Sequence, residues 1–311
     1  MASNSLIEWC MATWNFLVGC TKKSERDSKG ELNWTGRINF DEDTLAMPLK
    51  MRLPQRIFVN SLSDLFHPNV KNEWIMAAFA VMMATPQHTY QILTKHPDRA
   101  ARWFRAVDVI ADQQGLTPRE LIEEAGLKFV EACHLQADMS DAWPLPNVHI
   151  LTSVEDQPTA DERIPWLLKI PAAARGISAE PLLAPINVER WLCSCPEKCQ
   201  QNGGSLTCST DGYLDWVIVG GESGPGARPM RPDWARLLRD QCVVAGVPFF
   251  FKQWGDWRPA EFADDWIREC EPKNVKDYGD DQPPVIRVGK KSAGRVLDGR
   301  QWGEYPGEAV L

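Results

Sequence analysis

A glycine-rich loop follows one of the apolar runs of the sequence. The run Leu214–Val219 is rich in β-branched residues and leads directly into Gly220-Gly221-Glu222-Ser223. Glycines after a strand let backbone N–H groups approach a ligand closely and form an anion-binding nest. Glu222 can accept from an amine or a ribose hydroxyl, and Arg228 can hold a carboxylate or phosphate through two hydrogen bonds. We therefore predict a ligand-binding loop, with a plain tight turn as the alternative. Its residues are Gly220, Gly221, Glu222, Ser223 and Arg228.

Polar side chains follow five other apolar runs. Asp64 and His67 come shortly after Arg56–Val59, and this loop offers a general base or a metal-binding carboxylate. Ser and Asp also favour turns and N-caps, so a structural role for the loop stays open. A single lysine at a strand end is more often a solvated or salt-bridged residue than a catalytic group. The candidate catalytic residues are Asp64, Lys95, Glu155, Glu180 and Lys252, and the candidate cofactor-binding residues of these loops are Asn60, Ser61 and Ser153.

Four of the nine cysteines lie within residues 193–208. Cys193, Cys195, Cys199 and Cys208 have the spacing C-x-C-x3-C-x8-C. Four thiolates form a common structural Zn²⁺ site, and an iron–sulfur cluster also takes thiolates. The spacing matches no standard zinc knuckle, so a metal that holds the loop and an incidental cluster of thiols both stay open. The odd number of cysteines and the lack of a secretory-signal pattern favour reduced thiols in a cytoplasmic protein.

The elements that position these residues alternate between strand and helix. Strands are expected at 56–60, 89–93, 148–151, 174–178, 214–219 and 247–251, with a further one near Thr13–Asn15. Continuous apolar strands that alternate with helices predict a parallel sheet covered on both faces. This number of units favours an α/β fold of the full or partial βα TIM-like barrel type over a small open sheet. In such a barrel the polar strand ends lie on one side, where active sites are built.

We expect a barrel domain over residues 1–258 and an extension over 259–311 that packs on it. A helical insertion is expected at about 107–145, with a capping box at 117–120, and the Cys-rich loop occupies 193–208. The formal net charge of −8 argues against non-specific coating of DNA. No apolar run is long enough to span a membrane, so we expect no membrane partner.

Several longer motifs resemble a known family. They are Ala12–Asn15, Gly19–Lys22, Ile57–His67, Pro86–Thr89, Leu93–Lys95, Ser153–Gln157, Ala179–Leu183, Val217–Gly224 and Phe251–Gly255. In this order they resemble phage and bacterial proteins that carry a three-cysteine motif and are related to radical S-adenosylmethionine enzymes. The resemblance covers about residues 5–258 and continues around 287–305. It implies a radical-SAM type of barrel, with a 4Fe–4S cluster on three thiolates and S-adenosylmethionine on the free iron.

The cysteine motif departs from the family pattern after its first member. Cys20 matches the first cluster ligand, but the next cysteine along the chain is Cys133. Two alternatives remain, a degenerate member without the cluster and a sequence from which the cysteine loop has been omitted. With the cluster, we expect radical chemistry on an unassigned, nucleic-acid-related substrate. Without it, we expect a module that binds a nucleotide or nucleic acid, or a cluster-independent enzyme that uses Asp64 and His67. A protein partner encoded nearby is a further expectation.

Overall fold

The computed structural model describes residues 12–19, 38–130, 142–192, 212–260, 272–279 and 283–307. The chain forms two compact units, Met1–Thr152 with Lys169–Ala174 and Ser153–Leu168 with Arg175–Leu311. Their boundary falls inside the range 1–258 for which one barrel domain is expected, and the second unit includes the C-terminal extension.

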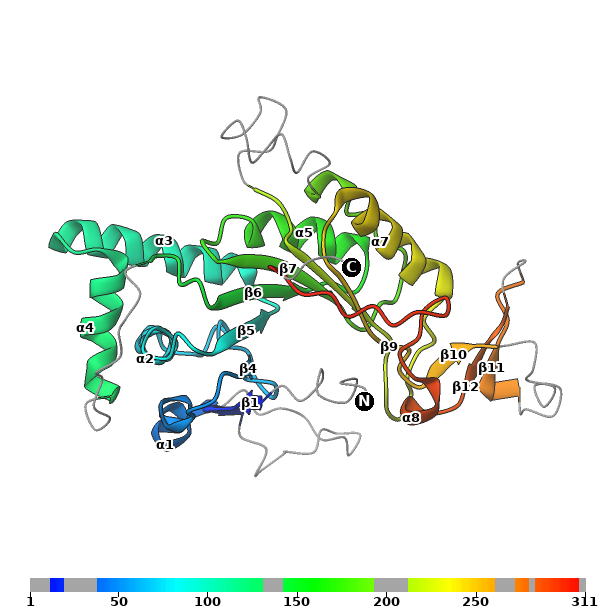
Figure 1. Ribbon diagram of the computed structural model, residues 1–311, viewed down its shortest axis with the longest axis horizontal. Helices are drawn as coiled ribbons and strands as arrows, with labels where there is room; N and C mark the ends of the chain where they lie inside the picture. The colour runs from blue at the N-terminus through cyan, green and yellow to red at the C-terminus, as the bar shows by residue number, and fades with distance from the viewer. Residues whose placement is uncertain are drawn as a thin grey trace, which may run out of the picture. The chain divides into compact units, whose positions relative to one another are not determined.

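The described residues of the first unit form four parallel strands in chain order (Figure 1). They are β1 (Ala12–Trp14), β4 (Arg56–Val59), β5 (Thr89–Thr94) and β6 (Val148–Ser153), whose last residue belongs to the second unit. A short antiparallel pair joins β2 (Leu17–Gly19) and β3 (Ile38–Phe40). The chain then forms α1 (Glu42–Leu45) and the 3₁₀ turn Met47–Lys50 before β4.

The described residues of this unit also form three longer helices. They are α2 (Asn72–Met83), α3 (Pro97–Gln114) and α4 (Pro118–Val130). The residues of α2 from Ala77 to Met83 are all buried, as expected of a helix that is apolar on all sides. Phe79 stacks on Trp103 of α3 at a centroid distance of 5.1 Å. The capping box expected at 117–120 is confirmed, because Thr117 and Glu120 exchange hydrogen bonds at the start of α4.

The second unit repeats the same alternation. The parallel neighbours β7 (Ala174–Ala179), β8 (Trp216–Gly220) and β9 (Phe249–Gln253) are accompanied by α5 (Gln157–Leu167), the 3₁₀ turn Glu189–Trp191 and α7 (Pro232–Ala245). Gly246 ends α7 with a φ of +67°, a left-handed conformation that glycine adopts without strain. β8 and β9 are rich in Val, Ile, Phe and Trp, which suit a sheet buried on both faces.

The C-terminal part of the second unit adds a small antiparallel sheet and an edge segment. The sheet has the order β10 (Trp257–Pro259), β12 (Val285–Arg287), β11 (Val275–Lys276), and it is accompanied by the 3₁₀ turn Pro272–Asn274 and α8 (Lys290–Ala293). Residues 302–304 then run along β9. Phe251 N donates to Trp302 O at 3.0 Å, and Phe250 forms an antiparallel bridge with Gly303. The C-terminal segment therefore occupies the edge of β9.

The strand order supports the predicted fold class at the level of a mixed α/β protein. Parallel strands follow one another in chain order with helices between them, as in a partial βα barrel. The radical-SAM type of barrel stays a prediction. Among the described residues, no helix is both long and apolar enough to cross a membrane.

Candidate functional site

Three strand ends of the second unit meet at one carboxylate. Glu180 follows β7 directly, and its Oε2 accepts a hydrogen bond from Lys252 Nζ of β9 at 2.6 Å. Its Oε1 accepts a second bond, of 3.2 Å, from Gln253 Nε2. Gly220 at the end of β8 lies beside this carboxylate, since a Cβ built there would be 3.1 Å from Glu180 Cδ. The side chains of Glu180 and Lys252 are 19% and 31% exposed, so solvent reaches the pair.

A β-bulge in β9 brings two neighbouring side chains to this carboxylate. Val219 of β8 pairs with Phe251. The next residue, Gly220, pairs with Gln253, which leaves Lys252 as an extra residue of β9. Successive side chains of a regular strand point to opposite faces, and the extra residue interrupts that alternation. Sequence periodicity identifies Lys252 but misses Gln253, because it does not show where a bulge occurs.

The glycine-rich loop after β8 packs directly on the loop after β9. Gly221 N donates to Gln253 O at 2.9 Å. A Cβ at Gly221 would lie 2.0 Å from Trp254 O, and one at Gly255 would lie 2.1 Å from Glu222 O. Only glycine fits at both positions, because two stretches of backbone touch there. The close approach that the sequence predicts at Gly221 is therefore an approach of the chain to itself.

Glu222 and Arg228 form a closed pair within the same loop. Arg228 donates from Nε to Glu222 Oε2 and from Nη2 to Oε1, both at 2.8 Å, and its backbone N also donates to Oε2 at 2.8 Å. These bonds hold the pKa of Glu222 below its ordinary value. Glu222 in turn raises the pKa of Arg228, and Glu155 adds a smaller electrostatic contribution. A ligand that reaches Glu222 must therefore compete with Arg228.

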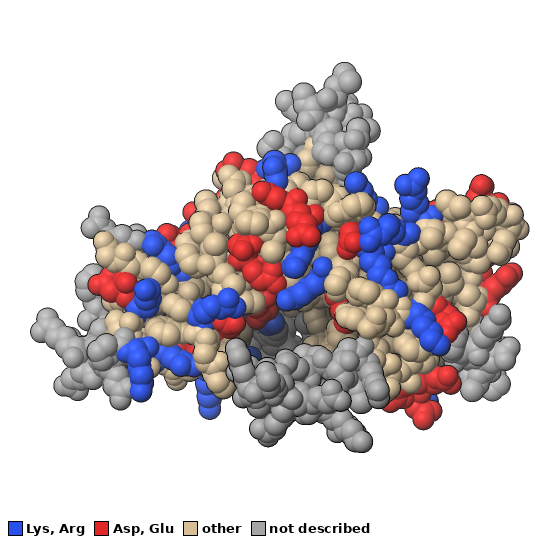
Figure 2. All heavy atoms as spheres, turned by 180° about the vertical axis from the view of Figure 1, so that it is seen from behind, with Lys and Arg blue, Asp and Glu red and all other residues tan. Residues whose placement is uncertain are grey.

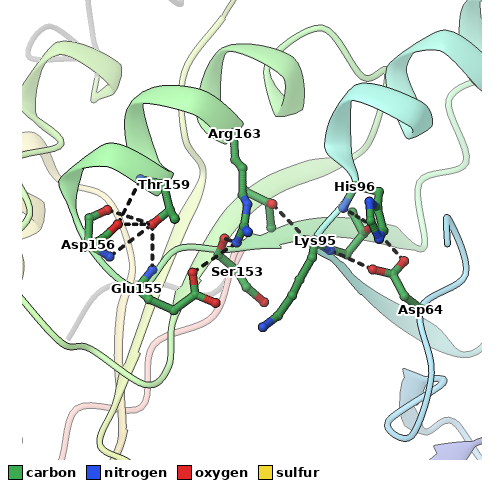
Figure 3. Close-up of polar contacts among 10 residues, drawn as sticks. Asp64, Lys95, His96, Ser153, Glu155, Asp156, Thr159 and Arg163 are labelled. Atoms are coloured by element: carbon green, nitrogen blue, oxygen red, sulfur yellow. Dashed lines mark hydrogen bonds and ion pairs between the residues drawn. The ribbon is translucent and has the colours of Figure 1, made fainter. Parts of the chain in front are cut away.

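Glu155 is held by an arginine that the sequence pattern does not single out. Arg163 of α5 donates from Nη1 to Glu155 Oε2 at 3.1 Å and to Ser153 O at 2.8 Å (Figure 3). Leu183 N donates to Glu155 O at 2.9 Å, which ties the segment after β7 to this residue. The Ser153 contact uses its backbone oxygen, so its predicted role as a cofactor ligand stays a prediction.

In the first unit, Asp64 joins the loop after β4 to the end of β5. Its Oδ1 accepts from Thr94 Oγ1 at 2.8 Å and from Phe66 N at 2.9 Å, and its Oδ2 accepts from Lys95 N at 2.7 Å (Figure 3). All three bonds orient the backbone and side chains of the two loops. They fit the structural role that the sequence leaves open, since the carboxylate already accepts three donors. The side chain of Lys95 is exposed.

The other polar residues of this loop tie it to the segment after β1. Asn60 is buried, has a φ of +56°, and accepts from Leu17 N through its Oδ1 at 3.2 Å. Ser61 Oγ donates to Asn15 Oδ1 at 3.0 Å. Ser63 Oγ donates to Leu17 O at 2.6 Å. Among the described residues, Asn60 Nδ2 has no hydrogen-bond partner, and the predicted role of Asn60 in cofactor binding stays a prediction.

His67 lies beside a second histidine. Its ring centroid is 5.7 Å from that of His96, and its Nδ1 accepts from Asn69 N at 3.2 Å. Burial, and then the charge of His96, lowers the pKa of His67. Arg99 donates to the backbone oxygen of His67. Asp64 and His67 are the pair expected to act as a base. The Asp64 carboxylate already accepts three hydrogen bonds, and the lowered pKa of His67 favours the neutral form of its imidazole.

The family model described as "Protein of unknown function (DUF5131)" matches residues 4–306. The chain belongs to this DUF5131 family. The match spans every strand named above. It also includes the strand-end residues around Glu180 in the second unit and those around Asp64 in the first. No curated protein and no solved structure matches the chain.

The metal sites expected for this DUF5131 chain fall on residues that the structure leaves undescribed. Cys20, Cys193, Cys195, Cys199 and Cys208 all lie outside the described residues. Cys242, the cysteine of the described part, is buried on α7, and burial raises its pKa, as expected of a core thiol. Within the described ranges, no three His, Cys, Asp or Glu side chains are grouped as metal ligands.

Proposed function

We propose that this chain is a radical-SAM-like barrel protein that binds S-adenosylmethionine at the strand ends of its second unit and acts on a nucleic-acid-related substrate. The resemblance of its motifs supports the protein class. The observation that carries the binding site is the convergence of Glu180, just after β7, with Lys252 and Gln253 at the end of β9. Open strand ends of this kind are where α/β barrels place their sites.

The pair Glu180 and Lys252 suits the amino-acid end of S-adenosylmethionine. A ligand with only one charge would leave one partner of this partly buried pair without its counter-charge, which is costly. A zwitterion avoids this cost, because its ammonium can take Glu180 while its carboxylate takes Lys252. Gln253 can form a hydrogen bond with either the ammonium or the carboxylate, since its amide both donates and accepts.

A 4Fe–4S cluster, if bound, would pass an electron from an external reductant to S-adenosylmethionine for its reductive cleavage. The described residues do not fit such a cluster, because Cys242 is a core thiol and no three ligating side chains meet among them. We therefore assign to Glu180, Lys252 and Gln253 only the binding and orientation of the ligand.

Binding by full-length protein tests this proposal. We would titrate S-adenosylmethionine and 5′-methylthioadenosine, which lacks the amino-acid group, into anaerobically prepared protein by calorimetry. Wild type should bind S-adenosylmethionine about tenfold more tightly or better, and Glu180→Gln and Lys252→Met should lose this preference. Lys291→Met, at an exposed lysine of α8, should keep it. Equal affinity of wild type for both compounds, or no binding of S-adenosylmethionine, would contradict the proposal.

A second candidate is a cluster-less module that binds a nucleotide or nucleic acid. The absence of cysteines between Cys20 and Cys133 favours it. On the face drawn in Figure 2, basic and acidic side chains are intermixed among the coloured residues, so charge gives this candidate no added support. Iron analysis of the protein after reconstitution with iron and sulfide distinguishes the radical-SAM-like protein from the cluster-less module. About four irons per chain would favour the radical-SAM reading, whereas no iron with salt-dependent RNA or DNA binding would favour the module.

A further inference from the structure

The backbone of Gln253 is held between two strand ends of the second unit. Its carbonyl oxygen accepts a hydrogen bond from Gly221 N at 2.9 Å, and the bulge in β9 pairs Gln253 with Gly220 of β8. Gln253 is the last residue of β9 and is partly exposed. Its side chain therefore starts from a fixed point beside the Glu180 carboxylate, and the orientation of its amide decides which atom meets a ligand.

The amide nitrogen of Gln253 faces three acceptors of the same unit. Nε2 lies 3.2 Å from Glu180 Oε1, 3.4 Å from Gly221 O and 3.4 Å from Ser223 Oγ. The carboxylate oxygen and the carbonyl oxygen accept hydrogen bonds and do not donate them. A reversed amide would place Gln253 Oε1 against both of these oxygens, which is repulsive. The chain therefore fixes the amide with its nitrogen turned toward Glu180.

This orientation leaves Gln253 with an acceptor to offer. Oε1 lies across the planar amide from Nε2, and among the described residues no group donates a hydrogen bond to it. A free amide both donates and accepts, but this one meets a ligand with its oxygen. To donate instead, it would have to turn over and lose its contacts with Glu180, Gly221 and Ser223.

The charges around Glu180 give the site a direction. Lys252 Nζ lies 2.6 Å from Glu180 Oε2, whereas the uncharged amide of Gln253 contacts Oε1. A ligand ammonium is favoured on the Gln253 side, where it is near the Glu180 charge and farther from Lys252. A ligand carboxylate on that side would face oxygens of both Glu180 and Gln253. A water can also donate to Gln253 Oε1, but it gains nothing from this arrangement of charge.

We infer that Gln253 is a specificity-determining residue, whose Oε1 accepts a hydrogen bond from the ligand ammonium and so directs the ligand carboxylate to Lys252. This inference rests on the proposed binding of the amino-acid end of S-adenosylmethionine. It adds a direction to that binding, because Gln253 recognises the ammonium and not the carboxylate.

Three thioether ligands separate the two groups in calorimetric titrations of full-length, anaerobically prepared protein. S-adenosylhomocysteine has both groups, 5′-(3-aminopropylthio)-5′-deoxyadenosine has only the ammonium, and 5′-(3-carboxypropylthio)-5′-deoxyadenosine has only the carboxylate. Gln253→Met keeps a side chain of similar length without the amide. It should weaken binding of the two ammonium ligands about tenfold and leave the affinity for the carboxylate ligand unchanged. Lys291→Met, at an exposed lysine of α8, should leave all three affinities unchanged.

NMR of wild type tests the contact itself. The side-chain signals of Gln253 are assigned by their absence from the spectrum of Gln253→Met. The Gln253 Cδ signal should shift with the aminopropyl compound, because its oxygen gains a charged donor, and should shift much less with the carboxypropyl compound. A Cδ signal that shifts with neither compound, or only with the carboxypropyl compound, would overturn the inference. Equal loss of affinity for all three ligands in Gln253→Met would overturn it as well.

The affinities of wild type distinguish failure of this inference from failure of the proposed function. If wild type binds S-adenosylhomocysteine no more tightly than 5′-methylthioadenosine, the amino-acid end is not recognised and both proposals are wrong. If wild type shows that preference while Gln253→Met keeps its full affinity for S-adenosylhomocysteine, only the role of Gln253 is wrong.

Discussion

Glu180 connects two strand ends through its two oxygens. Lys252 and Gln253 take one oxygen each, and both reach it from the bulge in β9. The pair with Lys252 is only partly exposed, so its two charges depend on one another more than a surface pair would. This coupling should be measurable in the protein without any ligand.

We expect Lys252→Met to lower the free energy of unfolding by about 1–3 kcal/mol, because it leaves the Glu180 charge with only an amide partner. Glu180→Gln should cost a comparable amount. The double variant should be more stable than the sum of the two single effects predicts, since neither charge is then left alone. Urea unfolding at neutral pH measures all four proteins.

Lys291→Met is the matched control for loss of a lysine charge, and its stability should stay close to that of wild type. Strict additivity of the two single variants would show that Glu180 and Lys252 are independent. That result would contradict the binding of a zwitterion by Glu180 and Lys252 as a coupled pair.

At the scale of residues, the sequence predicts which polar residues lie at strand ends better than it predicts what each of them contacts. Glu180 and Lys252 can be selected because polar residues after buried strands collect on one side of a parallel sheet. Gly221 is selected for closeness to a ligand, yet it contacts Trp254 O, because a glycine does not tell which backbone approaches it. Asp64 binds three donors of the chain, a pattern that depends on the loop after β5 and cannot be read locally.

At the scale of elements, the carboxylate of Asp298 binds the C-terminal segment to two arginines of α7. Asp298 accepts from Arg236 Nη2 at 2.7 Å and from Nε at 3.0 Å, and it also accepts from Arg239. Four residues later the chain reaches Trp302, whose carbonyl binds Phe251 N of β9. The attachment therefore lies next to the segment that occupies the edge of β9.

This attachment should weaken in acid. Hydrogen bonds from Arg236, followed by those from Arg239, hold the pKa of Asp298 below its ordinary value of 3.8. A carboxyl with a lowered folded pKa contributes stability above its unfolded pKa and loses it as the pH falls through the folded value. Hydrogen exchange of the Phe251 amide should therefore accelerate, beyond its intrinsic pH dependence, as the pH drops from about 5 to below 3.8.

Asp298→Asn supplies the control for this effect. Its Phe251 amide should be less protected at neutral pH and should lose little further protection in acid. Because Asp298 is partly exposed, added salt should reduce the difference between the two proteins. Parallel loss of protection in wild type and Asp298→Asn would mean that other carboxyl groups control this edge.

Element order is the most predictable part of the fold, and local irregularity is the least. Apolar runs separated by helical periodicity mark β4 to β9, and the capping box marks the start of α4. The extra residue in β9 and the pairing of residues 302–304 with it have no such signal. Both depend on contacts between segments far apart in the chain, which periodicity does not contain.

At the scale of the whole molecule, the occupied edge of β9 has consequences for solubility. A strand edge with free N–H and C=O groups is a template for pairing with another chain. Residues 302–304 fill this edge in the second unit, and Trp302 and Tyr305 pack on Phe249 and Phe250 at centroid distances of 5.8 Å and 5.3 Å. The segment thus covers both the backbone edge and its aromatic side chains.

Removal of residues 300–311 should expose this edge, and we expect self-association that grows with protein concentration. Light scattering and size-exclusion chromatography measure it. Removal of residues 308–311 alone leaves the paired segment in place and should have no such effect. A shortened chain that stays monomeric with native exchange of the Phe251 amide would show that the segment is dispensable.

The same segment determines how another protein could approach this strand. A free β-strand edge is a docking place for an extended peptide, which binds by adding itself as a further strand. Here that place is taken by the chain's own residues 302–304, so they act as a tethered peptide ligand of β9. A synthetic peptide covering residues 297–307 should then bind the shortened chain and reverse its self-association, whereas the intact chain should not bind the peptide.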